Sequence, residues 1–319
     1  MSVSQTAPGR PTATSAPSAI ARFLDSDLLY AFRRSPVAVV SALAVLLCVV
    51  GAFGCDWLAP HDPFDLASLN LLDSMQPPAW LAGGTWSYPL GSDDQGRDVL
   101  SAVMYGTRIS LIVGLCAIAF ALTVGVSIGL LSGYAGGTLD AVLMRVADVQ
   151  LTFPAILIAL LVDGVIRAVL PRGMAESVEL YVLIFAIGIA RWPQFARTVR
   201  GSTMVERGKD YVIAARVIGV ARWRIMAQHI LPNVLGPVLV FATLNLGLAV
   251  IDEATLSFLG VGLPPTQPSL GTLIRIGNDY LFAGQWWITV FPGITLAVMV
   301  LAFNLLGDWL RDALNPRLH

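Results

Sequence analysis

Three acidic residues stand beside long apolar stretches of the sequence, where a charge is costly. Asp252 and Glu253 follow the apolar run 225–251, and Asp163 follows the run 149–162. Ionisable side chains at membrane depth commonly carry protons or ions, or they line a transport path. In the competing interpretation, the same residues end helices at the membrane surface and have a structural role. The sequence leaves both interpretations open.

No signature of nucleotide hydrolysis accompanies these acids. The sequence has no G-x-x-x-x-G-K-[ST] phosphate loop, no H-E-x-x-H motif and no paired metal motif. The cysteines and histidines match neither a disulfide framework nor a metal-ligand spacing; they are Cys48, Cys55, Cys116, His61, His229 and His319. We therefore expect no catalytic residue, metal or cofactor on this chain, so any ATP hydrolysis has to come from another polypeptide.

The elements that must position the acids are membrane helices. Of the 319 residues, 56% are hydrophobic and 13% are charged, a balance typical of a polytopic membrane protein rather than a soluble domain. About 20 apolar residues span a bilayer as a helix. The apolar runs of this sequence predict an all-α polytopic membrane protein with six transmembrane helices.

The amino-terminal third divides into a tail, a first span and a loop. Residues 1–20 are mostly Ser, Thr, Ala and Pro, which predicts a disordered tail. Residues 21–55 combine a basic cytoplasmic flank with the uncharged run Ser35–Cys55, the first span. A lipoprotein-type signal ending at Cys55 is the rival interpretation, but this run begins too late for a usual signal sequence. Residues 56–107 are acidic and form an external loop.

Residues 108–307 hold the other five predicted spans. They are Ile109–Leu139, Leu139–Val162, Val178–Thr198, Ile225–Ile251 and Tyr280–Gly307. The fifth span is expected to begin after Pro232, and Asp252 and Glu253 are expected to close it. The Pro-rich segment Gly260–Asp279 is then an external loop.

Local patterns within these spans predict particular contacts. Arg145 and Asp148 lie one helical turn apart in the third span, where they can pair. Trp286 and Trp287 suit the outer membrane interface of the sixth span. Glycines at four-residue intervals in the second span let two helices pack closely, within this chain or against a second subunit; they are Gly125, Gly129, Gly133 and Gly137.

Basic residues are segregated by loop, which predicts the orientation. Arg33 and Arg34, with Arg22 before them, precede the first span. A second basic segment precedes the fifth span, and only Glu206 and Asp210 oppose it. Its members are Arg191, Arg197, Arg200, Arg207, Lys209, Arg216, Arg222 and Arg224. The positive-inside rule places both segments in the cytoplasm. We therefore expect a multi-pass protein of the plasma membrane with both termini cytoplasmic, residues 308–319 forming a short tail.

The stretch Tyr211–Asn233 lies within this basic segment and could dock a soluble partner. Apolar residues recur at helical spacing and a proline follows them; the positions are Tyr211, Ala214, Ala215, Ile218, Gly219, Leu231 and Pro232. Small residues on one face would let another protein approach the backbone, and Pro232 would end or kink the helix. An ordinary surface loop with an amphipathic helix fits the same pattern.

The spacing of this stretch resembles the motif of ABC-importer permeases: Glu-Ala-Ala, three residues, Gly, nine residues, then Ile-x-Leu-Pro. The matching residues are Ala214, Ala215, Gly219, Leu231 and Pro232. Ile213 stands where that family usually has Glu, and His229 stands where it often has Ile. In that family the segment forms a coupling helix, which enters a groove on a cytoplasmic ATPase. The resemblance implies that role for residues 200–232.

Further motifs resemble dipeptide and oligopeptide permeases, particularly the C-type. The segment Leu90–Val99 is similar to their Gly-Thr-Asp-x-x-Gly-Arg-Asp element, with Ser92 in place of Thr. Its key residues are Asp93, Gly96, Arg97 and Asp98, and we expect these to structure the loop or contact a binding protein. Other matching segments are 105–108, 133–137, 253–260 and 304–308. Together the motifs cover nearly all of the chain except its tail.

The resemblance implies a type I ABC importer permease architecture and a set of partners. The chain would pair with a homologous second permease, two cytoplasmic ATPase domains would bind ATP and Mg, and an extracytoplasmic binding protein would deliver substrate. The family moves di- and oligopeptides, while close relatives carry nickel complexes, glutathione or haem. Membrane lipid surrounds the spans, and no nucleic-acid partner is expected.

Two rival functions use the same residues differently. A proton-coupled secondary transporter would use Asp252, Glu253 or Asp163 as a relay and would need no ATPase. That function leaves the basic docking segment unexplained. A purely structural membrane anchor would not require motifs spread along nearly the whole chain. The importer permease is therefore the function that the sequence favours.

Overall fold

The computed structural model describes residues 27–65, 69–169, 175–264 and 266–313. The predicted disordered tail, residues 1–20, and the basic residue Arg22 lie outside these ranges. Within the described residues the chain is helical, and its single β-feature is an isolated bridge between Ser92 and Asp98.

Five of the described helices are long and apolar enough to cross a membrane, and a bent pair of helices provides up to one more span. The long helices are α3 (Pro36–Phe53), α5 (Val99–Ala135), α8 (Ala175–Arg207), α11 (Leu231–Phe258) and α13 (Trp287–Ala313), and the bent pair is α6 (Gly137–Leu151) and α7 (Ala155–Val169). The shorter elements are α2 (Asp27–Arg34), α4 (Cys55–Leu58), η1 (Leu71–Asp73), α9 (Asp210–Val217), α10 (Arg222–Arg224), the π-helical η2 (Ile225–Ile230) and α12 (Leu270–Leu281). The predicted all-α membrane fold is confirmed.

The ends of the first long helices follow from their capping residues. The Ser35 side chain accepts a hydrogen bond from the Ala38 backbone N–H, and Pro36 occupies the first helical turn of α3, where its missing N–H costs nothing. Asp98 caps α5 by accepting from the Ser101 N–H at 2.8 Å. Residues 99–107 are therefore helical, although the sequence analysis assigned them to the external loop. Gly136, at φ +67°, ends α5.

The glycine spacing of α5 serves a contact within the chain. A Cβ at Gly125, Gly129 or Gly133 would lie less than 3.0 Å from atoms of α8. These glycines therefore let α5 and α8 approach backbone to backbone. Gly137 does not belong to this contact, because it begins α6 at φ +62° with open space around it.

The predicted third span, Leu139–Val162, is not one continuous helix. Residues 137–169 form α6 and α7, which meet at an angle of 94°. Pro154 follows the end of α6, and its ring and missing N–H prevent a helix from continuing through that point. Asp148 lies 3.8 Å from Arg197 of α8 and not against Arg145 as predicted.

The fifth and sixth spans also differ from their predicted bounds. Helix α11 continues to Phe258, so Asp252 and Glu253 lie inside it rather than at its end. The segment predicted as an external loop contains α12, and α13 begins only at Trp287. Trp287 is buried, and its indole N–H donates to the Ser92 carbonyl at 3.1 Å, so it packs inside the protein and not at a lipid interface.

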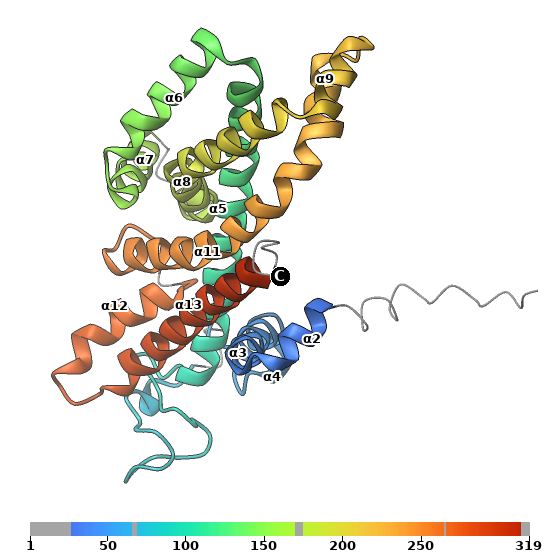
Figure 1. Cartoon of the computed structure of the whole chain (residues 1–319). Coiled ribbons are helices and arrows are strands. Elements are labelled where there is room, and N and C mark those ends of the chain that lie inside the picture. Colours follow the sequence, from blue (N-terminus) through green and yellow to red (C-terminus); the bar gives the residue numbers. More distant parts are fainter. Residues whose placement is uncertain (1–26, 66–68, 170–174, 265, 314–319) are drawn as a thin grey trace, which may run out of the picture.

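Figure 1 shows how these elements are placed. Helix α5 runs through the molecule, and α9 lies at one end of it. The segment between α4 and α5 lies at the opposite end. The basic segment and the acidic loop are thus separated by the length of the membrane helices.

Candidate functional site

Helix α9 packs one face onto the chain and leaves the other open. Val212 and Ala215 are buried in the same apolar cluster as Ile225 and Ile230 of η2 and Val234 of α11. The small side chain of Ala215 therefore serves an internal contact. The sequence pattern predicts Ala215 on a face for another protein, and its 4% exposure contradicts that prediction.

The outward face of α9 is apolar and has no covering within the described residues. Ile213, Val217 and Ile218 are 47%, 81% and 78% exposed. Ala214 is also exposed, and Gly219 turns the chain at φ +80° with open space where a Cβ would stand. Apolar side chains gathered at the tip of a protruding element commonly mark a protein contact.

Tyr211 ties α9 to the elements on both sides of it. Its hydroxyl donates to the Glu206 carboxylate at the end of α8 and accepts from the Asn233 side-chain amide of α11 at 3.0 Å. Partial burial and the bond to Glu206 raise the pKa of the Tyr211 hydroxyl. The Lys209 ammonium also binds Glu206, at 2.6 Å. Displacing α9 would therefore pull on both membrane helices.

Leu231 and Pro232 lie at the start of α11, with the proline in the first helical turn. No interruption precedes them, because η2 runs directly into α11. The sequence predicts that Pro232 ends or kinks a helix; the structure instead has a π-helical segment, Ile225–Ile230, before it. The widened turns of a π-helix are often found at functional sites.

Glu253 is fully buried and bonded to serines on different helices. Its carboxylate accepts from Ser110 of α5 and from Ser257 of α11, both at 2.7 Å. The Ser110 hydroxyl also accepts from the Leu270 N–H at the start of α12. Glu253 thus joins α5, α11 and α12 through hydrogen bonds, as a buried polar group requires.

Asp252 has a different partner from the adjacent residue Glu253. Its carboxylate lies 2.6 Å from the Arg191 guanidinium of α8. Arg191 is itself 5% exposed and also donates to the Leu248 carbonyl. This is a buried ion pair between α8 and α11.

Asp163 belongs to a third cluster, at the end of α7. Arg167 binds Asp163 at 2.6 Å, Glu179 of α8 at 2.7 Å and the Gly262 carbonyl at 2.9 Å. The three acids of the sequence analysis therefore do not meet in one site. Among the described residues no group of three metal-ligating side chains comes together either.

The external-loop motif is buried and bonded to itself. Asp93 accepts from the Gln95 and Arg97 backbone N–H groups at 2.9 and 2.8 Å, and Arg97 lies 3.4 Å from the Asp93 carboxylate. Burial raises the pKa of Asp93, against the charge of Arg97 and these backbone bonds. Gly96 is required because a Cβ there would stand 2.4 Å from the Asn70 carbonyl, and Asp98 caps α5. These contacts favour a structural role for the motif.

Several polar contacts were missed from the sequence. The sequence predicts Arg191 only as a member of the basic cytoplasmic segment, and Arg167 belongs to none of the sequence predictions. Asp140 of α6 binds Arg200 of α8 through both carboxylate oxygens and accepts from Ser132 of α5. Arg167 and Arg191 interrupt apolar runs, and this is the signal that could have suggested an ion pair.

One motif and one pocket suggest no chemistry. Residues 125–129 spell G-x-S-x-G, but they lie inside α5, and Ser127 donates to the Thr123 carbonyl of its own helix.

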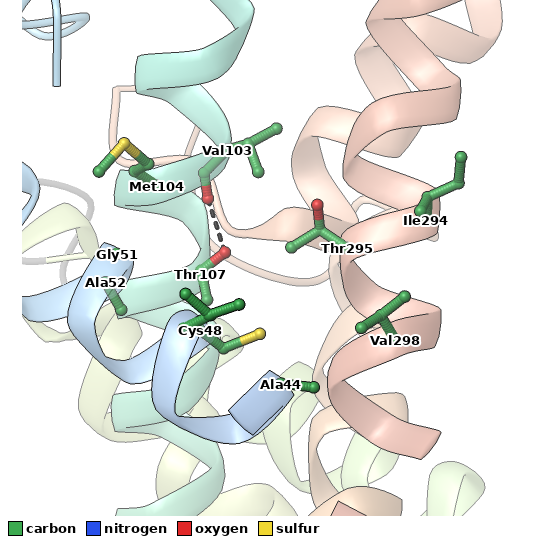
Figure 2. A pocket seen from close by; sticks show the side chains of 11 residues that line it. Ala44, Cys48, Gly51, Ala52, Val103, Met104, Thr107, Ile294, Thr295 and Val298 are labelled. Carbon is green, nitrogen blue, oxygen red and sulfur yellow. Dashed lines mark hydrogen bonds between the residues drawn. The ribbon is translucent and has the colours of Figure 1, made fainter. Parts of the chain in front are cut away.

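Figure 2 shows a pocket between α3, α5 and α13, with a volume of about 300 Å³. Its hydroxyls, on Thr107 and Thr295, donate to carbonyls of their own helices. The pocket is otherwise apolar.

Comparison with known proteins shows similarity over almost the whole chain. Residues 125–319 match the family described as "Binding-protein-dependent transport system inner membrane component". Residues 26–78 match the "N-terminal TM domain of oligopeptide transport permease C". The dipeptide transport system permease protein DppC of Haemophilus influenzae is 36% identical, covering 92% of this chain and 94% of that protein.

Two further proteins are similar to this chain, one in sequence and one in fold. The glutathione transport system permease protein GsiD of Pectobacterium atrosepticum is 39% identical, covering 90% of this chain and 89% of that protein. A solved inward-facing structure of the MetNI methionine ABC transporter covers 67% of this chain and 97% of its own, with a TM-score of 0.53 and 19% identity. At that identity the likeness is one of fold.

Proposed function

Because the chain belongs to the family of inner-membrane components of binding-protein-dependent transport systems, we propose that it is one of two permeases of an ATP-driven importer of di- and oligopeptides. As a family member it is a multi-pass, non-catalytic inner-membrane subunit, and a partner ATPase binds ATP. The partner permease is a homologue of this chain. Both termini of the chain are cytoplasmic, as its basic flanks indicate.

The observation that carries the coupling role is the outward face of α9. This face lies in the basic segment, exposes Val217 and Ile218, and stands at the end of the molecule away from the acidic loop. In the proposed mechanism the ATPase holds this face. Closure of the ATPase domains moves α9, and Tyr211 and η2 pass the motion to α8 and α11. The two states of the ATPase thereby bias two states of the spans.

The proposal of a peptide substrate is based on the names of the similar proteins. They are named for dipeptides, for di- and tripeptides and for glutathione, which is itself a tripeptide. Glutathione import by the same machinery is the second candidate. Nickel chelates and haem remain candidate substrates from the family resemblance. Proton-coupled transport is less well supported, since Asp163, Asp252 and Glu253 bind separate partners.

The docking role is tested by placing a charge on the exposed face. Val217→Asp and Ile218→Asp alter side chains that are 81% and 78% exposed, so the chain should still fold. A buried Val or Ile side chain contributes roughly 1.5–3 kcal/mol, so each variant should weaken ATPase association about tenfold or more. Co-purification of the ATPase and uptake of labelled dipeptide measure this.

Leu72→Asp is the matched control. Leu72 is 90% exposed and belongs to the segment at the opposite end of the molecule. The control should retain the ATPase in full. Normal ATPase association in both α9 variants would overturn the docking role. Uptake of a dipeptide, glutathione, nickel-chelate and haem panel by the reconstituted complex then tests the substrate class.

A further inference from the structure

A cavity of about 790 Å³ lies beside α9. It is formed where α5, α6, α8, α9, α10 and η2 come together. Its volume is within the range of about 300–1,000 Å³ that is typical of small-ligand sites. Three arginines line it, Arg207 of α8, Arg216 of α9 and Arg222 of α10, and none of its described lining residues is acidic.

Two of these arginines are held in place by one residue of α5. Arg207 donates to the Tyr134 carbonyl at 3.1 Å, and the Arg216 guanidinium lies 5.1 Å from the centre of the Tyr134 ring. Neither contact neutralises the charge. Arg222 is exposed beside them. The guanidiniums are therefore partly positioned before any ligand arrives.

The charge of this cluster is not cancelled by a nearby acid. In the part of the chain that the structure describes, no carboxylate lies within 4.0 Å of these three guanidiniums. Asp140 interacts electrostatically with Arg207, but both of its carboxylate oxygens already bind Arg200. The cavity thus presents three positively charged guanidinium groups to an anion. Phosphate oxygens are natural partners of such donors.

The other side of the cavity is apolar. Leu131 and Leu139, which are 42% and 41% exposed, line it together with Ile225 and Met226. These residues lie at the ends of α5 and α6 and in η2, at the end of the membrane helices where α9 lies. A ligand that fills the cavity would place an anionic group on the arginines and an apolar part against the leucines.

We propose that this cavity binds the phosphate of an anionic phospholipid from the cytoplasmic leaflet. The inference rests on the proposed function for its orientation, since that orientation puts the cavity at the cytoplasmic membrane surface. Basic pockets at this depth suit anionic head groups, and each nearby arginine attracts them. An acidic protein surface fits less well, because α9 already offers a separate apolar face to a protein partner, whereas Leu131 and Leu139 lie at the ends of the membrane helices α5 and α6, which lipid surrounds.

Lipid binding to the assembled transporter tests the proposal. Native mass spectrometry of the purified complex, titrated with phosphatidylglycerol, would compare Arg207→Gln/Arg216→Gln/Arg222→Gln with the wild type. We expect the tightest phosphatidylglycerol site to weaken on the order of 100-fold. The control Arg33→Gln/Arg34→Gln/Arg224→Gln removes the same charge outside the cavity and should keep that site. The single variant Arg222→Gln, at an exposed side chain, should give an intermediate loss.

Several results would overturn the proposal. Unchanged phosphatidylglycerol binding in the triple cavity variant would do so, as would equal binding of zwitterionic phosphatidylcholine. Inorganic phosphate that binds as tightly as the lipid would identify a soluble anion instead. Loss of the ATPase without loss of lipid would identify a protein contact. Dipeptide uptake by the control tests the proposed function independently, so the two ideas can fail separately.

Discussion

A buried acid such as Glu253 can serve as a hydrogen-bond partner or as a proton carrier, and substitutions can distinguish the two roles. Its oxygens accept from Ser110 and Ser257 on two helices, and its exposed fraction is zero. A glutamine has the same shape: its amide oxygen can accept from one hydroxyl and its amide N–H can donate to the other, whereas it cannot carry a proton. We expect Glu253→Gln to retain most stability and uptake, measured by thermal unfolding in detergent and by dipeptide transport.

Glu253→Ala is the informative contrast. It leaves both serine hydroxyls without their partner and opens a cavity, so we expect a loss of about 2–4 kcal/mol in unfolding free energy. Uptake should fall with it. Loss of uptake in Glu253→Gln at unchanged thermal stability would instead favour a proton relay at this residue.

The pair of Arg191 and Asp252 makes a second prediction at this scale. Asp252→Ala would leave a buried guanidinium without its carboxylate, which costs about 3–5 kcal/mol. Replacing both residues, as Arg191→Met/Asp252→Leu, removes the charges together and should recover much of that loss. Thermal unfolding of the two variants measures the difference. A double variant no more stable than Asp252→Ala would contradict this account of the pair.

At the scale of elements, the contact between α5 and α8 depends on glycine. A Cβ at Gly129 would stand 2.6 Å from the Ala196 carbonyl oxygen and 2.7 Å from the Val199 Cβ. We expect Gly129→Ala to destabilise the protein by roughly 1–3 kcal/mol through overpacking. The midpoint of thermal unfolding should fall accordingly.

Gly201→Ala is the matched control for that substitution. Gly201 lies in α8, and a Cβ added there would meet nothing within 4 Å. The change should therefore be neutral or stabilising by up to about 1 kcal/mol of helix propensity. Equal destabilisation by both substitutions would contradict this account, because Gly201 has no close neighbour and helix propensity favours Ala over Gly at both positions.

Sequence patterns predicted the helices better than their interruptions and partners. The length of the apolar runs predicted the spans, and the glycine spacing predicted a close contact. Periodicity carries no information about which helix lies opposite, so the choice of α8 required the structure. The break at Pro154 was missed because apolar residues continue on both sides of it.

The candidate site was predictable in part for the same reason. Helical spacing brought Tyr211, Ala214 and Ile218 into one segment, but it could not tell which side of α9 packs against η2. Ala215 was therefore placed on the wrong face. Arg191 was assigned to the basic cytoplasmic segment because a charge usually lies outside a span, whereas here Asp252, distant in sequence, compensates it.

At the scale of the whole molecule, the fold predicts which end faces the cytoplasm. In a background without Cys48, Cys55 and Cys116, we expect Leu72→Cys to react with a membrane-impermeant maleimide in intact cells. Asp312→Cys, and Ile218→Cys in cells that lack the partner ATPase, should react only after permeabilisation. Their side chains are exposed, so failure to label would not reflect burial within this chain. Labelling of Ile218→Cys in intact cells would reverse the orientation.

The glycine contact of α5 also decides how the molecule can transmit force. At Gly125, Gly129 and Gly133 the α5 helix has no side chain, and an added carbon would meet the α8 backbone at Trp192, Ala196 and Arg200. The two helices are therefore in close contact over three successive turns. We expect them to move together as one unit when the end of α8 is displaced.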